Sequence, residues 1–469
     1  MIFNDLKCEK RNSASINDSI FLVKQTIKEE VKMGHLVGKD VFRQLGKKID
    51  GLETRAPWNN KLHALLKELY SVEEADVVIK MPYGLSTFEE LIRATNYDRT
   101  ELRRIIDQLT SKGLVVDIWA NEEYRYTPSP MIVGIFEFTM MRMGPNLNTK
   151  EWAKLLHEYL DGDDDFRAAN HGGGNQVASL RALPHEEVIK PGDYYEVLDY
   201  EKASVLISET DKFSIALCSC RHEKQHLGEK TCSVPLGKCS QFGQAADLMI
   251  RHNLSREVSR TEMEENFAES REMGLVLGVD NVRKNARFVC HCCHCCCDTL
   301  LGISKYGYPN SIVTSNYIAE IDDNACIGCG KCAKACPINA ISMVAREQQD
   351  AKKKQDAKVD TSICIGCGVC ALKCPKKACA LARRGTRVIH PETTFERIML
   401  QSLERGTLHN QIFANPQSVN EKFMRAFVGG FLKLTPVKKA LMSDGLRSRF
   451  LSAMKDGVVK QGKGWVLDI

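Results

Sequence analysis

The chain lacks any apolar run that approaches the ~20 residues of a transmembrane helix. Its longest candidate, residues 131–141, contains Glu137. The first ten residues also lack an apolar core of the signal-peptide type. The sequence therefore predicts neither a membrane span nor secretion, and we expect a cytoplasmic protein.

The signatures of several enzyme classes are missing as well. No G-x-G-x-x-G follows a predicted strand, which argues against a Rossmann-type nicotinamide or flavin site. There is no P-loop, no catalytic triad and no C-x3-C-x2-C triplet for radical chemistry on S-adenosylmethionine. The segment His171-Gly-Gly-Gly174 resembles an esterase oxyanion loop, but no G-x-S-x-G nucleophile elbow accompanies it.

The bulk composition is that of a globular protein, apart from its cysteines. A length of 469 residues predicts about three domains, and 27% charged with 43% hydrophobic residues is ordinary. The net charge of +5 is too small to indicate nucleic-acid binding by itself. Twenty cysteines in a reducing compartment are metal ligands rather than disulfides.

Eight of these cysteines form two copies of one motif, C-x2-C-x2-C-x3-C-P. The first copy holds Cys326, Cys329, Cys332 and Cys336, and the second holds Cys364, Cys367, Cys370 and Cys374. This is the bacterial spacing for a cubane iron–sulfur cluster. Glycines within both motifs let the backbone approach a cluster closely, because they carry no Cβ atom. Zinc knuckles also use C-x2-C, but they do not need four thiols within eleven residues twice.

The two motifs resemble the two-cluster bacterial ferredoxin domain, and the match is complete in both halves. In that family the fourth cysteine of each motif binds the other motif's cluster. The resemblance therefore implies one 4Fe–4S cluster on Cys326, Cys329, Cys332 and Cys374. It implies a second on Cys364, Cys367, Cys370 and Cys336. A polar insert at residues 345–358 is expected to project into solvent, and Cys379 is expected not to be a ligand.

Ten further cysteines lie upstream and are predicted to bind metal: Cys218, Cys220, Cys232, Cys239, Cys290, Cys292, Cys293, Cys295, Cys296 and Cys297. They suffice for one or two additional 4Fe–4S clusters, with structural zinc as the alternative. Six of them fall within eight residues. One short loop cannot aim six sulfurs at one ion, so some serve another centre or stay free. Arg221 and His222 are expected to stabilise the thiolates.

A c-type haem site is formally matched by Cys290-x-x-Cys293-His294. We exclude it, because such haems are attached outside the cytosol and the neighbouring thiols would compete.

Residues 57–130 are predicted to form a winged-helix-like domain. The pattern indicates a helix carrying Leu62 and Leu69, a second beginning at Ser86-Thr87, and a third from about Asp98 to Ser111. Two strands then form the wing. Residues 60–130 contain nine Lys/Arg against twelve Asp/Glu, a net of −3, which disfavours DNA binding. Protein docking is the favoured use of this domain. Three arginines of the third helix, Arg99, Arg103 and Arg104, keep a regulatory role open.

The C-terminal region is predicted to be helical and basic. Residues 421–463 hold ten Lys/Arg and three acids. Phe423, Phe427, Phe431 and Leu434 recur at helical spacing, which favours an amphipathic helix packed on the protein. A surface for an acidic redox partner and weak membrane-surface association are the alternatives.

The sequence thus predicts an α+β multidomain protein. We expect a helical segment at 1–56, the winged-helix-like domain at 57–130, a linker and helical region at 131–205, a Cys-rich domain at 206–320, the ferredoxin-like domain at 321–385, and the basic helical region at 386–469. This order is similar to that of a family of iron–sulfur proteins from anaerobic microbes. That resemblance spans about residues 60–385 and implies electron transfer.

Two functions from different classes follow from these patterns. The first is an electron-transfer relay, or a subunit of an anaerobic oxidoreductase complex with redox protein partners. Lysines around the motifs, among them Lys331, Lys334, Lys373, Lys376 and Lys377, would dock an acidic partner. The second is an iron–sulfur redox sensor that acts on DNA through the winged helix. A third option, two-electron chemistry at the Cys-dense loop, leaves open whether the chain is itself an enzyme.

Overall fold

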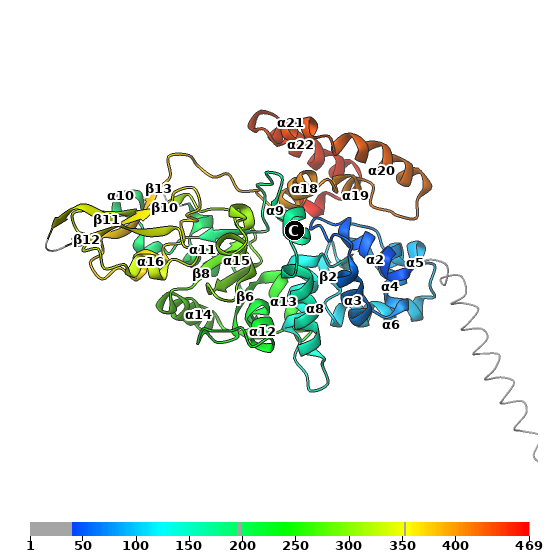
Figure 1. The fold of residues 1–469 in the computed structure, drawn as a ribbon. Coiled ribbons are helices and arrows are strands. Elements are labelled where there is room, and N and C mark those ends of the chain that lie inside the picture. The colour runs from blue at the N-terminus through cyan, green and yellow to red at the C-terminus, as the bar shows by residue number, and fades with distance from the viewer. Residues whose placement is uncertain (1–39, 195–197, 351–352, 469) are drawn as a thin grey trace, which may run out of the picture.

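The computed structural model describes residues 40–194, 198–350 and 353–468. Within them the chain mixes helices and sheets in several units, as the predicted α+β multidomain class requires (Figure 1). Most of the helical segment expected at 1–56, including Cys8, lies outside the described residues. Its described part contains α2 (Val41–Asp50), which begins at the N-cap Asp40.

The N-terminal unit places three helices where the sequence predicts them. Thr87 caps the second of them by accepting a hydrogen bond from the Glu90 N–H, while the Glu90 carboxylate accepts one from the Thr87 N–H. An additional helix, not predicted, begins with the same kind of cap at Ser71. The helices are α3 (Asn60–Leu69), α4 (Val72–Lys80), α5 (Phe88–Thr95) and α6 (Arg99–Ser111).

A three-stranded antiparallel sheet follows these helices. Its strands β1 (Ser86–Thr87), β2 (Val115–Ala120) and β3 (Glu123–Pro128) lie in the order β1-β3-β2. Leu45, Leu62, Leu66, Ile105 and Ile106 are fully buried between the helices and this sheet. The N-terminal unit therefore has a hydrophobic core of its own.

Strands β2 and β3 pack against the rest of this chain. Asp117 on β2 accepts hydrogen bonds from Arg251 (2.7 Å) and pairs with His252 (2.6 Å), both at the end of helix α13 (Gly243–Arg251). The Arg125 guanidinium on β3 lies 4.2 Å from the ring centroid of Trp465 near the C-terminus. These two strands thus form an internal interface.

The arginines of α6 are engaged within the N-terminal unit. Arg99 pairs with Glu89 (2.5 Å) and Arg104 with Glu73 (2.6 Å). Arg103 lies over the Phe88 ring at 3.8 Å and donates to the Tyr126 hydroxyl. All three charges have partners on the same surface, so they do not form the free basic patch that DNA binding requires.

Residues 131–205 do more than link two units. They contain α7 (Phe136–Met141), α8 (Thr149–Asp161), α9 (Asp165–His171), the short helix α10 (Pro191–Tyr194), and β4 (Leu180–Leu183), which pairs with a strand of the next region. Asp161 begins the acidic stretch 161–165, whose composition predicts a solvated turn, and residues 162–165 are exposed as expected. The Asp161 side chain itself is buried against Arg167, with Lys224 at 3.3 Å. Its carboxylate joins α8 to α12 (Ser219–His226).

The middle unit is a six-stranded antiparallel sheet in the order β4-β8-β9-β6-β5-β7. Its remaining strands are β5 (Phe213–Leu217), β6 (Gly237–Phe242), β7 (Ser255–Val258), β8 (Val276–Asp280) and β9 (Phe288–Cys292). Besides α12 and α13 its helices are α11 (Ala203–Ser208), α14 (Arg260–Met273) and α15 (Asp298–Ser304). Helices α12 and α15 both begin directly after a cysteine.

The two cysteine motifs occupy a small domain at the end of the molecule opposite the N-terminal unit (Figure 1). Strands β10 (Tyr317–Ile321) and β13 (Cys379–Arg383) pair antiparallel, with Tyr317 opposite Arg383. The one-turn helices α16 (Lys331–Ala335) and α17 (Val369–Leu372) follow the motif loops. Between the motifs, β11 (Ile341–Asp350) and β12 (Lys353–Val359) form a hairpin that projects outward, as expected for the polar insert.

The C-terminal region is helical. Its helices are α18 (Thr394–Arg405), α19 (Leu408–Ile412), α20 (Val419–Leu432), α21 (Thr435–Met442) and α22 (Asp444–Lys460). Arg405 donates to the Glu53 carbonyl (2.8 Å), and Arg397 pairs with Asp280 on β8 (3.3 Å). Helix α18 therefore joins the N-terminal unit to the middle sheet.

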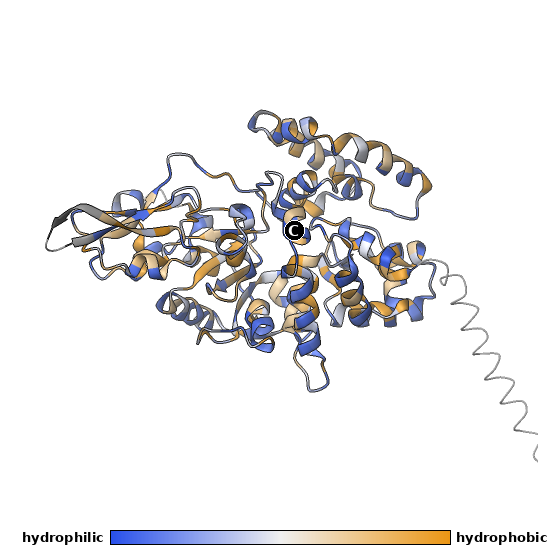
Figure 2. Ribbon diagram, viewed as in Figure 1, coloured by the Kyte–Doolittle hydropathy of each residue, from blue (hydrophilic) through white to orange (hydrophobic). Residues whose placement is uncertain are grey.

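The aromatic face of α20 corrects one expectation. Phe423, Phe427 and Phe431 are 70%, 72% and 59% exposed, so this face does not pack on the protein. Figure 2 shows hydrophobic residues along α20. Helix α20 is instead anchored by Leu432, which joins Leu403 of α18 in a separate core. The prediction that these apolar residues share one helix face is correct, but the prediction that this face packs on the protein is wrong.

Among the described helices, none is both long enough and apolar enough to cross a bilayer.

A pair of substitutions tests the exposure of α20. Phe427→Ser should change the free energy of unfolding by no more than about 0.5 kcal/mol, because the ring is already in water. Leu403→Ala, in the buried core of α18, should cost about 2–5 kcal/mol. Thermal unfolding under anaerobic conditions measures both. Equal destabilisation by the two variants would show that the Phe427 ring is buried.

Candidate metal centres

The two motif loops share a backbone design that brings sulfur atoms inward. Gly330 and Gly368 precede α16 and α17 with φ of 70° and 86°, a left-handed conformation that favours glycine. A Cβ atom on Gly366 would lie 2.1 Å from the Tyr317 carbonyl oxygen, so no other residue fits there. The loops therefore wrap tightly around the space that their cysteines enclose.

The structure sorts the eight motif cysteines into two groups, each around its own cavity. One cavity is lined by Cys326, Cys329, Cys332 and Cys374. The other is lined by Cys336, Cys364, Cys367 and Cys370. The fourth cysteine of each motif thus lies at the cavity of the other motif. This is the grouping that the ferredoxin resemblance implies, while ligation itself stays a prediction.

The chemistry of the two cavities fits iron–sulfur clusters. Each offers four thiols within an apolar lining that includes Ile321 or Ile338. Backbone N–H groups point at the sulfurs: Ala340 donates to Cys336 Sγ (3.2 Å) and Gly328 to Cys326 Sγ (3.4 Å). Such hydrogen bonds stabilise the negative charge of a thiolate-bound cluster. Burial raises the pKa of the Cys332 and Cys336 thiols, so their thiolates form together with metal binding.

The two cavities differ in their access to solvent. The second motif's loop faces the middle unit, where the backbone N–H of His185 donates to the Cys367 carbonyl (3.1 Å). Arg384, directly after β13, donates to the Cys364 carbonyl of the same loop. In the first motif's loop Cys329 is exposed and Ile327 is 46% exposed. The first motif's cavity therefore lies nearer the surface.

Cys379, predicted not to be a ligand, lies between the two groups. Its Sγ is 3.6 Å from Cys370 Sγ, although the residue also lines the first motif's cavity. Strand β13 places it there, and its exclusion from the ligand set stays a prediction.

A third cavity of about 190 Å³ lies between the N-terminal unit and the middle sheet, and seven of the ten upstream cysteines line it. One of them, Cys293, also belongs to a separate thiol group described below, and the other six are Cys218, Cys220, Cys239, Cys290, Cys292 and Cys297. Cys290 and Cys292 are two residues apart on β9, so the strand turns both to one face. Cys218 and Cys297 are the residues that cap α12 and α15. We call this the six-cysteine cavity.

Hydrogen bonds connect the thiols of the six-cysteine cavity. Hydrogen bonds from Cys220 and Cys292 hold the pKa of Cys297 well below its usual value, and backbone N–H groups of α15 add to the effect. Hydrogen bonds with Cys218 and with Cys297 raise the pKa of Cys220, and hydrogen bonds with Cys290 and with Cys297 raise the pKa of Cys292. A bound metal would deprotonate these thiols.

Arg221 supplies the buried positive charge of this region. Its side chain is fully buried and donates to the carbonyls of His291 and Pro235. Burial by itself would lower its pKa, but the thiolates of Cys218 and Cys293 raise it above the ordinary value. The prediction that Arg221 lies beside the thiolates is correct.

His222 has a different role from the predicted one. Its Nδ1 lies 2.6 Å from the Met140 carbonyl, and its ring lies 4.6 Å from the His226 ring, centroid to centroid, at an angle of 57°. Helix α12 turns adjacent residues to different sides, so His222 faces α7 rather than the thiols.

Glu137 also lines the six-cysteine cavity. From the sequence, this residue is identified only as a charge within an apolar run. Its carboxylate accepts a hydrogen bond from the Gly134 N–H (3.0 Å), and burial raises its pKa to about 7. The fold of residues 131–141 over the cavity brings it there. No motif signals this position.

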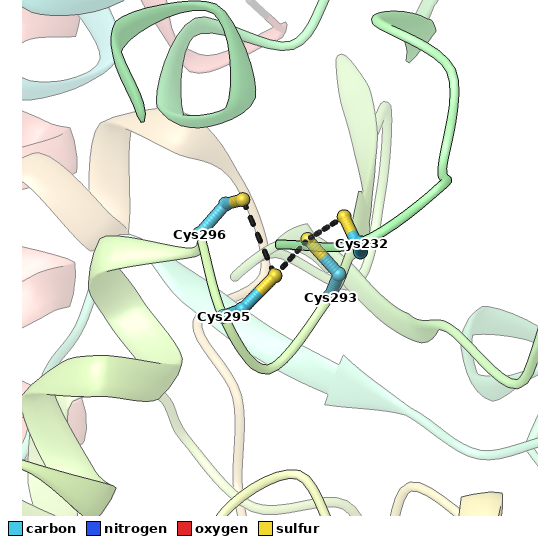
Figure 3. A group of neighbouring side chains, drawn as sticks. All are labelled: Cys232, Cys293, Cys295 and Cys296. Carbon is cyan, nitrogen blue, oxygen red and sulfur yellow. Dashed lines mark hydrogen bonds between the residues drawn. The ribbon is translucent and has the colours of Figure 1, made fainter. Parts of the chain in front are cut away.

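The other four upstream cysteines, Cys232, Cys293, Cys295 and Cys296, form a compact group of their own, with all sulfurs within 4.8 Å of one another (Figure 3). Cys293 also borders the six-cysteine cavity. The ten upstream cysteines therefore divide into a set of four and a set of six.

Comparison with known proteins gives one match. Residues 325–378 match the family model of the 4Fe-4S dicluster domain, a range that contains all eight motif cysteines. No curated protein and no solved structure matches the chain. The C-terminal half thus carries a ferredoxin-like iron–sulfur domain, which together with the cysteine groups supports an iron–sulfur electron-transfer protein.

Paired substitutions test how the motif cysteines share two clusters. Cys326→Ser and Cys374→Ser should each remove about four irons per chain, and the double variant should remove no more, because both residues would serve one cluster. Cys364→Ser combined with Cys374→Ser should remove about eight irons per chain, because these two residues would serve different clusters. Iron and labile sulfide are measured after anaerobic purification. Ligation within single motifs predicts the opposite pattern for the two double variants.

Proposed function

We propose that this chain is an electron-transfer relay, or an electron-transfer subunit of an oxidoreductase complex from anaerobic metabolism, with two 4Fe–4S clusters in residues 321–385. The grouping of the eight motif cysteines across the two motifs is the observation that carries this proposal. When bound, the clusters supply one-electron transfer. The backbone N–H groups at Cys326 and Cys336 and the apolar linings would tune that potential.

We also propose an additional 4Fe–4S cluster in the six-cysteine cavity. The cavity combines more than four thiols, an apolar lining and the buried cation Arg221. Arg221 would offset the negative charge of thiolates and cluster without needing solvent. The motif loop of Cys367 lies against the same middle unit through His185. Electrons would then pass from the middle unit through the second motif to the first.

The first motif's cavity is the proposed contact site for a redox partner. Lys331 and Lys376 line it and are exposed, as is Cys329, so positive charge surrounds the more accessible cysteine group. An acidic partner surface would be attracted there and oriented for transfer. Lys373, also near these loops, instead donates to the Glu272 carbonyl (2.7 Å) and supports the contact with the middle unit.

Membership in a hetero-oligomeric complex is supported by the exposed face of α20. Phe423, Phe427 and Phe431 form an apolar strip with the exposed cations Lys422 and Lys433 on the same helix and directly after it. Like charges disfavour pairing of two copies of this face. An acidic partner subunit with an apolar groove is therefore the proposed occupant.

The N-terminal unit is assigned a structural role. We propose that residues 57–130 are a winged-helix-type domain whose wing docks on α13 and the C-terminus through Asp117 and Arg125. The redox-sensor alternative is not favoured, because the arginines of α6 are paired within the unit. Catalysis would belong to a partner. We place the protein in the cytoplasm, where thiol ligands stay reduced.

Redox titration with a binding assay tests the relay. Anaerobically purified protein should contain at least about eight irons and an equal amount of labile sulfide per chain, and dithionite should bleach it reversibly. Genomic DNA fragments should not shift in gels at physiological salt. Salt-sensitive DNA retention with clusters that do not cycle would favour the sensor and overturn the relay.

Charge reversal tests the contact site. Lys331→Glu combined with Lys376→Glu should slow oxidation of the reduced protein by one equivalent of ferricyanide, an anion, and speed oxidation by hexaammineruthenium(III), a cation. Stopped-flow absorbance measures both rates, and the differences should shrink at high salt. The matched control is Lys439→Glu with Lys460→Glu on the C-terminal helices. Equal effects of the two pairs would rule out a local contact site.

A further inference from the structure

The set of four upstream thiols is held by two separate segments. Cys232 lies in the loop between α12 and β6, whereas Cys293, Cys295 and Cys296 lie in the turn between β9 and α15. Figure 3 shows the four side chains converging from these segments. Cys232 Sγ is 3.6 Å from Cys293 Sγ, which is 4.0 Å from Cys295 Sγ, and Cys295 Sγ is 3.4 Å from Cys296 Sγ.

We propose that these four cysteines bind a single tetrahedral metal ion, zinc or iron, and not an iron–sulfur cluster. Four sulfurs at about 2.3 Å from one tetrahedral ion are about 3.8 Å apart. Three of the six separations, 3.4, 3.6 and 4.0 Å, bracket this value, and all six lie within 4.8 Å. In a cubane each thiolate binds a different iron, so the ligand sulfurs stand farther apart than around one ion.

The surroundings of the group fit a closed structural site. Val234 and Leu275 cover it, 8% and 3% exposed, and Cys296 is fully buried. All four positions of a tetrahedral ion are filled by protein sulfurs, as in structural zinc sites. Lys230 lies beside the group and donates to the Cys232 carbonyl (2.5 Å), which brings a positive charge toward a site that four thiolates would make negative.

The ion would brace the neighbouring six-cysteine cavity. Cys292 and Cys297 directly flank the three ligands of the turn and both line that cavity. Arg221 lies on α12, which leads into the loop of Cys232. One ion bound by both segments would therefore hold together two walls of the six-cysteine cavity that otherwise belong to separate loops. It also leaves six cysteines for one additional cluster, not two. The site does not depend on the electron-transfer proposal.

Metal analysis of the full-length protein tests this site. Anaerobically purified wild type should contain about one zinc per chain, or about one iron in excess of labile sulfide. For zinc, X-ray absorption at the zinc edge should show four sulfurs at about 2.3 Å. For iron, the excess over labile sulfide identifies the single ion, because each iron of a cluster is also bound by four sulfurs. The zinc and iron arms distinguish the two ions, and both support the site. A wild type with neither zinc nor excess iron overturns the proposal.

Two serine variants complete the test. Cys232→Ser should lose the single ion while keeping the iron and sulfide of the clusters, because Cys232 is the one member of the group outside the turn. Cys379→Ser, a buried cysteine outside the group, should keep the ion. Loss of about four irons with matching sulfide in Cys232→Ser would show a cluster instead and overturn the proposal. Should Cys232→Ser not fold, the zinc content of the wild type, or its iron in excess of labile sulfide, still decides.

Discussion

The burial of many thiol groups close to one another is the constraint on which the structure depends. Thiolates that share a small apolar space repel one another and lose hydration, unless a metal neutralises them. In the ferredoxin-like domain the regular structure is slight: two two-stranded sheets and two one-turn helices. Two-stranded pairs are marginal by themselves. Metal–thiolate bonds are therefore expected to supply much of the folding free energy of this domain.

Buried cations complement the cysteines in the middle unit. Arg221 has no exposure, and its hydrogen bonds to two backbone carbonyls fix it where α12 begins. The opposite side of α12 is held to α8 by Asp161 and Lys224. A helix anchored on both sides keeps Cys218 and Cys220 in place relative to β9. Rigid placement of ligands matters in electron transfer, because the transfer is faster when the site rearranges little as its charge changes.

Several local features could be predicted from the sequence because neighbouring residues determine them. Thr87 with Glu90 and Asp98 with the Thr100 N–H start helices by hydrogen bonds within four residues. Glycine-rich C-x2-C loops close on themselves in the same way. Features that depend on distant partners were missed. The burial of the Asp161 side chain depends on its contacts with Arg167 and Lys224, which the sequence does not reveal. Strand β4 was not predicted, because it forms by pairing with β8.

By itself the sequence determined the spacing of the ferredoxin motifs, the number of thiols and the identity of their glycines, since backbone geometry over a dozen residues is local. Only the tertiary structure decided which upstream sulfur meets which. Cys232 reaches Cys293 across 61 positions of sequence through the pairing of β6 with β9. Whether the phenylalanines of α20 face a core or solvent was decided likewise, because helical spacing defines a face but the neighbouring elements determine what covers it.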